Sequence, residues 1–98
     1  MARRSIEFHP EAVAEAQAAT EWYRQRSERA ADAFLAELDT AVDRIAEAPG
    51  RWPAYLRGTR RFLLRRFPFA VVYRKVGETV QVVAVAHGRR KPGYWKGR

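Results

Sequence analysis

The spacing of apolar residues changes along the chain, and in the first half it predicts a strand followed by two helices. Residues 6–8 alternate in polarity, whereas apolar residues recur at helical spacing over residues 10–26 and again after Ser27. Ser27 is a suitable N-cap, and the run Ala48-Pro49-Gly50 ends the second helix. This second helix has the clearer apolar stripe, which consists of Ala31, Phe34, Leu35, Leu38, Ala41, Val42 and Ile45.

The second half of the chain is predicted to form a loop over residues 51–58 and then three β-strands. Residues 59–67 alternate loosely, residues 69–76 are apolar and β-branched, and residues 79–86 return after a two-residue turn at Gly77-Glu78. The resulting order, βααβββ, predicts a single α+β domain that spans the whole chain, residues 1–98. In this domain a helical hairpin packs on a small antiparallel sheet.

Side-chain alternation gives more detailed expectations for the last strand. It assigns this strand's residues to two faces, with Val80, Val82, Ala84 and Ala86 on one and Val83, Val85 and His87 on the other. We expect Trp22 and Tyr23 to make core or helix–helix contacts, and Trp52 and Tyr55 to hold the loop against the sheet. Glu15, with Glu11 on the same helix face, is interpreted as ordinary helix surface.

Charge is distributed very unevenly between the two halves of the chain. Residues 1–49 contain 6 Arg and 10 Asp or Glu, whereas residues 50–98 contain 13 Lys or Arg and one acid, Glu78. The net charge of +8 is therefore the sum of an acidic half and a strongly basic half. Such an asymmetry indicates a basic face that binds nucleic acid or an acidic protein, and a purely solvated basic surface is the alternative.

Composition excludes several classes of chemistry. The absence of cysteine excludes disulfides and thiolate sites, and the two histidines are too far apart to suggest a metal site. Ser5 and Ser27 stand where serine hydrolysis is not expected, and there is no glycine-rich phosphate loop. No cofactor is expected. We find no signal peptide and no membrane-spanning segment, so we expect a soluble, cytoplasmic protein.

Candidate functional residues concentrate after the last strand. The tail carries His87, Arg89, Arg90, Tyr94 and Trp95, and Pro92 with its flanking glycines is typical of a segment that lacks fixed structure without a partner. Basic residues also follow one another in the predicted strand of residues 59–67, at Arg60, Arg61, Arg65 and Arg66. If the two strands are neighbours, these guanidinium groups converge on one face of the sheet.

Such a cluster permits two kinds of activity. It could stabilise a pentacovalent phosphate in a metal-free ribonuclease, with His87 or Tyr94 moving protons and Arg65 and Arg89 holding charge. Alternatively, it could dock an acidic partner, and His87 would then have a structural role as a hydrogen-bond donor to a neighbouring backbone carbonyl.

Taken together, the sequence resembles the toxins of the RelE/ParE superfamily, which belong to bacterial type II toxin–antitoxin (plasmid stabilisation) modules. The resemblance covers nearly the whole chain, and each of its segments is short. It comprises His9–Ala12, Glu21–Tyr23, the helix positions Phe34, Leu38, Ile45 and Pro49, and the runs 56–61, 66–74 and 83–90.

This resemblance implies a growth-inhibiting toxin that a cognate antitoxin silences by wrapping an acidic or amphipathic segment over the basic groove. RelE-like members are similar to ribosome-dependent mRNA endoribonucleases, and ParE-like members resemble non-enzymatic inhibitors of DNA gyrase. In the ribonuclease members an arginine commonly precedes the apolar run that ends in tyrosine, but Ala70 stands there in this chain. Residues 49–58 also lack the acid that some of them place in this loop.

Two matches favour the ribonuclease members: Arg89 corresponds to their arginine after the last strand, and Tyr94 or Trp95 stands near their terminal aromatic. The strand ending Ala86–Arg89, however, fits the ParE-like pattern better. We therefore predict a toxin that binds its target and antitoxin through Arg60, Arg61, Arg65, Arg89, Arg90, Tyr94 and Trp95. The alternatives are a RelE-like endoribonuclease, with Arg65 replacing the missing arginine, and a basic domain that only binds nucleic acid.

Overall fold

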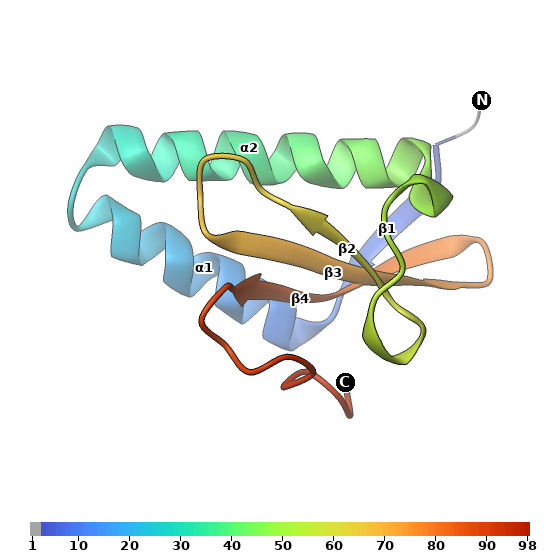
Figure 1. The fold of residues 1–98 in the computed structure, drawn as a ribbon. Helices are drawn as coiled ribbons and strands as arrows, with labels where there is room; N and C mark the ends of the chain where they lie inside the picture. Colours follow the sequence, from blue (N-terminus) through green and yellow to red (C-terminus); the bar gives the residue numbers. More distant parts are fainter. Residues whose placement is uncertain (1–2) are drawn as a thin grey trace.

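The computed structural model describes residues 3–98 and confirms the order of elements predicted from the sequence. The elements, shown in Figure 1, are β1 (Ser5–Phe8), α1 (Pro10–Arg24), α2 (Glu28–Glu47), β2 (Arg60–Leu63), β3 (Phe69–Val76) and β4 (Thr79–His87). Two short 3₁₀ turns, Pro49–Arg51 and Leu56–Gly58, shape the loop between α2 and β2. None of the helices within residues 3–98 is long and apolar enough to cross a membrane.

Local capping explains where the helices begin. The Nδ1 atom of His9 accepts a hydrogen bond from the Glu11 N–H at 3.1 Å, and Pro10 occupies the first turn of α1. Ser27 caps α2 as predicted, because its hydroxyl accepts a hydrogen bond from the Ala30 N–H at 3.2 Å. The apolar stripe of α2 and the alanines of α1 then pack the hairpin onto one face of the sheet.

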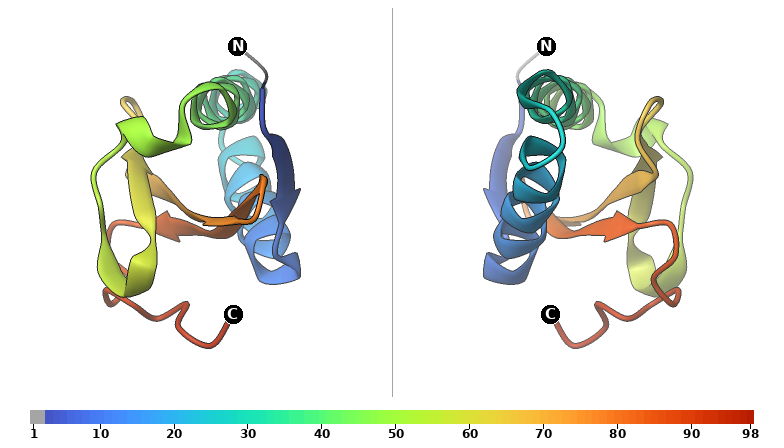
Figure 2. Two further views of the ribbon diagram at one scale, coloured as in Figure 1. Left: turned by 90° about the vertical axis from the view of Figure 1, so that its right-hand side faces the viewer. Right: turned by 90° about the vertical axis from the view of Figure 1, so that its left-hand side faces the viewer.

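The sheet has the order β1-β4-β3-β2, and it is mixed rather than wholly antiparallel. The pairs β2–β3 and β3–β4 are antiparallel as expected, whereas β1 runs parallel to β4. The parallel pairing arises because the two helices form the crossover between β1 and the rest of the sheet. Figure 2 shows β1 at one side of the sheet and the loop of residues 49–59 at the other.

The strand β2 is shorter than predicted and ends at Leu63. The Glu37 carboxylate of α2 accepts hydrogen bonds from the backbone N–H groups of both Arg65 and Arg66. Its hydrogen bonds take the chain out of the sheet, so Arg65 and Arg66 lie beside α2 and not on a strand. Because β3 lies between β2 and β4, these two strands are not neighbours, and the condition on which the convergence of arginines depended is not met.

A β-bulge at Val83 reverses the alternation of side chains in β4. Tyr73 pairs with Val82 and Val72 pairs with Ala84, so Val83 is an extra residue. Before the bulge Val82 packs against the helices, and after it Val85 does so. The predicted assignment of all even-numbered residues to one face is therefore wrong beyond Val82.

The bulge gives the protein a second apolar cluster on the face of the sheet that the helices do not cover. Val72, Val83, Ala84 and Trp95 form this cluster, with Tyr55, Ala86 and Tyr94 packed against it.

The larger core lies between the helices and the sheet, and there Tyr23 contacts Phe34, Phe67 and Phe69 through its ring. Trp22, by contrast, is 51% exposed, so the expectation of a core contact is wrong for this residue.

Tyr73 links the sheet to the end of α2, and its hydroxyl donates a hydrogen bond to the Pro49 carbonyl. The side chain is 1% exposed, and burial raises the pKa of its hydroxyl to about 12. We expect Tyr73→Phe to lower the free energy of unfolding by about 1–3 kcal/mol, because it leaves the buried carbonyl unpaired. Urea denaturation measures this loss.

The control is Tyr55→Phe, since the Tyr55 hydroxyl makes no side-chain hydrogen bond within residues 3–98. Equal stability of both variants would show that the Tyr73 hydrogen bond contributes nothing.

Candidate functional site

Glu15 of α1 occupies a junction between the helix, the sheet and the C-terminal tail (residues 88–98). Its carboxylate accepts hydrogen bonds from the Val85 N–H at 3.0 Å and from the Tyr94 hydroxyl at 2.6 Å. The Arg98 guanidinium donates two more, at 2.9 and 3.1 Å, and the pair is largely buried with side-chain exposures of 15% and 14%. Glu15 is therefore a structural anchor. Its interpretation as ordinary helix surface is wrong.

The reason for this junction is an unpaired strand edge. Because β1 ends at Phe8, opposite Val82, the outer edge of β4 has no neighbouring strand beyond that point. Glu15 pairs with the Val85 N–H, and Arg98 donates to the Val83 carbonyl at 3.1 Å. The ion pair thus satisfies backbone groups that would otherwise lack partners.

The tail is ordered by these contacts, contrary to the expectation of a segment without fixed structure. Trp95 is 3% exposed in the second cluster, and Arg74 donates a hydrogen bond to the Arg98 carbonyl at 2.8 Å. Trp95 is therefore a core residue rather than an exposed docking residue. Tyr94 stays half-buried, and the Arg90 guanidinium lies 3.7 Å from the centre of its ring.

Electrostatics at the junction favour the ionised pair. Burial raises the pKa of the Glu15 carboxyl, but hydrogen bonds from Arg98, Tyr94 and Val85 outweigh burial and hold that pKa below its ordinary value. The hydrogen bond to Glu15 raises the pKa of Arg98. Burial, together with the hydrogen bond to Glu15, raises the pKa of the Tyr94 hydroxyl well above its usual range. Tyr94 thus keeps its proton at neutral pH.

The tail and the end of β4 form the wall between two cavities. The first, here called the sheet groove, has a volume of about 280 Å³ and lies on the face of the sheet that the helices leave open. Its lining includes Tyr55, Arg61, Leu63, Ala70, Val72 and Trp95. The second, the helix groove, has a volume of about 420 Å³ and is lined by α1, including Ala18, Ala19 and Trp22. Pro68, Phe69, His87, Arg90 and Tyr94 line both grooves.

The predicted site residues are only partly gathered at these grooves. Arg61 lies in the sheet groove with its guanidinium 4.2 Å from the centre of the Tyr55 ring, and Arg90 and Tyr94 are in the shared wall. Arg60 points elsewhere and donates a hydrogen bond to the Trp52 carbonyl at 2.7 Å. Arg89 is exposed on the tail next to the grooves.

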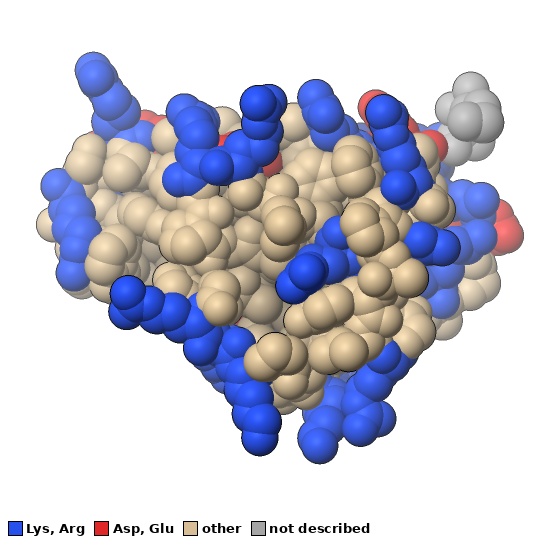
Figure 3. Space-filling view, in the orientation of Figure 1, with Lys and Arg blue, Asp and Glu red and all other residues tan. Residues whose placement is uncertain are grey.

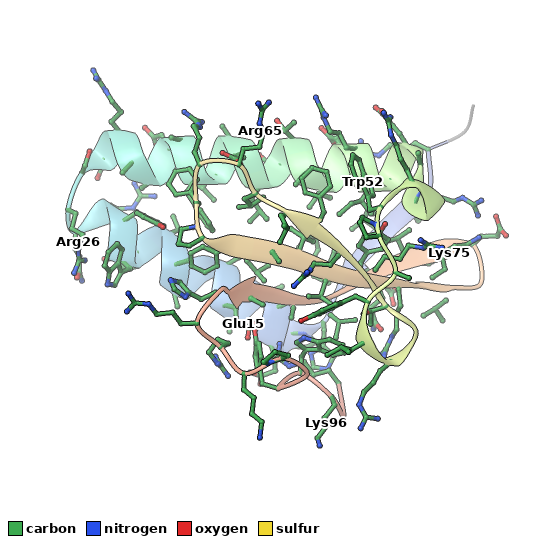
Figure 4. All side chains as sticks on the ribbon, viewed as in Figure 1. Glu15, Arg26, Trp52, Arg65, Lys75 and Lys96 are labelled. Atoms are coloured by element: carbon green, nitrogen blue, oxygen red, sulfur yellow. The ribbon has the colours of Figure 1, made fainter. Side chains whose placement is uncertain are left out.

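Arg65 lies far from this region, as Figure 4 shows by its position beside α2, away from Glu15. The backbone N–H of Arg89 donates to Nδ1 of His87 at 3.0 Å, so His87 accepts a local hydrogen bond where donation to a carbonyl had been expected. The prediction that Trp52 and Tyr55 hold the loop against the sheet is confirmed, since Trp52 contacts Phe62 of β2 and Tyr55 packs on the apolar cluster that includes Val72 of β3.

Sequence reasoning missed Glu15, Trp22 and Leu63. Glu15 could have been recognised from its spacing, because it shares a helix face with the buried residues Ala12 and Ala19. Leu63 is 61% exposed at the rim of the sheet groove, and the signal that could have identified it is the loose alternation that puts it on the same strand face as Arg61 and Arg65. Within residues 3–98, no three side chains of the types His, Asp or Glu gather closely enough to hold a metal ion.

Comparison with known proteins identifies the family of this chain. Residues 6–92 match the model of the ParE toxin of the type II toxin–antitoxin system, parDE. The chain belongs to the ParE toxin family. The match ends within the tail, before Tyr94, Trp95 and Arg98, so the residues that complete the Glu15 junction lie outside it.

Individual relatives are more distant. Toxin ParE2 of two Mycobacterium tuberculosis strains is 33% identical over 55 residues, which are 56% of this chain and 52% of the relative. The match thus spans about half the length of these curated relatives. The structure "Chromosomal ParDE TA system from P. aeruginosa" has a TM-score of 0.75 at 21% identity, covering 87% of this chain and 96% of that one. This likeness supports the same α+β fold.

The Glu15 junction gives a prediction about pH. A carboxyl whose pKa is lowered by folding stabilises the protein above its ordinary pKa, about 4.3, and this stabilisation is lost as pH falls through the lowered value. We expect Glu15→Gln to cost roughly 2 kcal/mol at pH 7 and to weaken the fall in stability between pH 5 and the acid limit. Urea denaturation across this range measures both.

The matched control is Glu47→Gln, at an exposed position near the end of α2. If Glu15→Gln keeps the full acid sensitivity of the unmodified chain, the junction does not stabilise the fold as described.

Proposed function

We propose that this chain is the toxin of a parDE-type pair, and that it binds both its antitoxin and an essential cytoplasmic target through the sheet groove. The observation that carries this proposal is the lining of the groove, an apolar floor flanked by two guanidinium groups stacked on tyrosine rings. Figure 3 shows this face, where uncharged surface in the centre is surrounded by Lys and Arg and acidic atoms appear only near the upper and right-hand edges.

The apolar part of the groove supports protein binding. Leu63 is 61% exposed, and it stands beside Ala70 and Val72 of β3. Large exposed apolar residues next to a concave, apolar floor are typical of surfaces that a partner covers. A partner side chain inserted here would be desolvated on several sides, as at the centre of protein interfaces.

The charged part supports an acidic partner. Arg61 and Arg90 are held over the rings of Tyr55 and Tyr94, so their guanidinium groups lose little freedom when they bind a carboxylate. Neither arginine has an acidic partner within residues 3–98. A segment that alternates apolar and acidic side chains would complement both features, and antitoxin and target would then compete for one surface.

Several features argue for binding rather than ribonuclease chemistry. The Tyr94 hydroxyl already donates to Glu15, and its raised pKa makes it a poor proton carrier at neutral pH. Arg65 is held beside α2 by Glu37, and it lines neither of the two grooves that His87 lines. Ala70 lines the groove where a charged side chain would be needed to stabilise a phosphate.

The proposed target is DNA gyrase, as the family resemblance implies, and translated mRNA is the alternative. We expect purified toxin to block DNA supercoiling by gyrase while messages on translating ribosomes remain intact. Cleaved messages with unaffected supercoiling would instead make the chain an endoribonuclease. If messages are cleaved, the variant His87→Gln tests whether His87 transfers a proton, because Gln keeps a polar side chain in the groove lining but cannot act as an acid or base.

Leu63 provides a direct test of the sheet groove. We expect Leu63→Ser to weaken antitoxin binding at least tenfold, equivalent to about 1.4 kcal/mol, because an exposed anchor contributes to binding and not to the core. Calorimetric titration with the antitoxin measures the change, and growth arrest on induced expression should weaken in parallel.

The matched control is Val76→Ser, since Val76 is 53% exposed at the far end of β3 and lines neither groove. Equal binding by the Leu63 variant and the unmodified chain would exclude the sheet groove as the docking surface.

A further inference from the structure

Beyond the sheet groove, three basic residues surround a depression at the lower edge of the molecule. Arg57 in the loop before β2 and Lys91 and Lys96 in the tail line a cavity of about 400 Å³, together with Leu56, Pro92 and Gly93. All three side chains are exposed, and none forms an ion pair with a carboxylate within residues 3–98. We call these three residues the basic rim. Figure 3 shows only basic and uncharged atoms along this lower edge, and Figure 4 places Lys96 there.

The backbone of Arg57 is an independent sign of function. Its φ of 56° lies in the left-handed region, and within residues 3–98 it is the one residue other than glycine with a positive φ. Thr59 stabilises this turn, because its hydroxyl and its N–H both donate hydrogen bonds to the Leu56 carbonyl, at 2.6 and 3.2 Å. A β-carbon is unfavourable in this conformation, and such residues concentrate at binding sites.

The tail presents its two lysines on a rigid support. Trp95, the residue before Lys96, is buried in the second apolar cluster on the sheet, and successive turns close from Lys91 to Tyr94 and from Gly93 to Lys96. The Glu15 junction fixes the end of the tail through Arg98. Three like charges held together in this way repel one another, so an anion that binds all three would be favoured and would meet a preorganised site.

We propose that the basic rim binds the phosphate backbone of duplex DNA. Proteins that bind single strands use exposed aromatic rings on which bases stack, and the aromatic residues nearest the rim cannot serve. Trp95 is buried, Tyr94 is bound to Glu15 and covered by Arg90, and Tyr55 is covered by Arg61. Exposed cations on a projecting edge, without stacking rings, suit sequence-independent contacts to a duplex backbone. Lys91 lines the sheet groove as well, so the basic rim adjoins the surface proposed for protein docking.

The test compares three exposed cations at the rim with three elsewhere. The rim variant is Arg57→Asn, Lys91→Gln, Lys96→Gln, in which Asn tolerates the left-handed backbone. The control is Arg29→Gln, Arg44→Gln, Lys75→Gln, which removes the same charge at exposed positions on α2 and β3. Binding of a fluorescent 20-base-pair DNA duplex is measured by anisotropy from 50 to 200 mM salt, and urea denaturation confirms that each variant is folded.

Each phosphate contact contributes about 0.9 to the slope of log affinity against log salt, so the rim variant should lose about 2–3 from this slope. The control should keep the slope and lose affinity only slightly. If the control variant loses as much of the salt slope as the rim variant, the effect depends only on net charge, and the proposal is wrong. Tighter binding of the single strand than of the duplex, or tighter binding of a poly-glutamate peptide of matched charge, would overturn it as well.

Discussion

The ion pair between Glu15 and Arg98 is the interaction on which the open face of this molecule depends. It lies where β1 ends and leaves the edge of β4 without a neighbouring strand. One partner binds the Val85 N–H and the other the Val83 carbonyl, so two side chains complete what a strand would otherwise provide. Since a buried charge without its partner is strongly unfavourable, either residue alone would destabilise the edge that the pair now satisfies.

The bulge at Val83 and the Glu15 junction act together to build a second apolar layer. Without the extra residue, Val83 and Ala84 would not both face the tail, and Trp95 would lack most of its contacts. With it, a domain of 98 residues buries apolar surface on both faces of its sheet. The tail is thereby a structural element, and it forms one wall of the sheet groove and of the helix groove.

This arrangement separates three kinds of basic residue that look alike in the sequence. Arg98 and Arg66 are bound to carboxylates, and Arg60 is bound to a carbonyl, so these three mainly hold the fold. Arg61 and Arg90 are stacked on rings at the sheet groove and remain available to a partner. The basic rim has neither kind of contact.

The sequence by itself determined the order of elements, the Ser27 cap, the apolar stripe of α2 and the family, because each depends on local periodicity or on short motifs. The tertiary structure decided the parallel pairing of β1, the reversal of faces after Val82 and the removal of Arg65 from the sheet. It also decided the role of Glu15, whose partner Arg98 is 83 residues away. Contacts of this kind depend on where the folded chain brings its segments together, and no spacing within a single helix or strand records them.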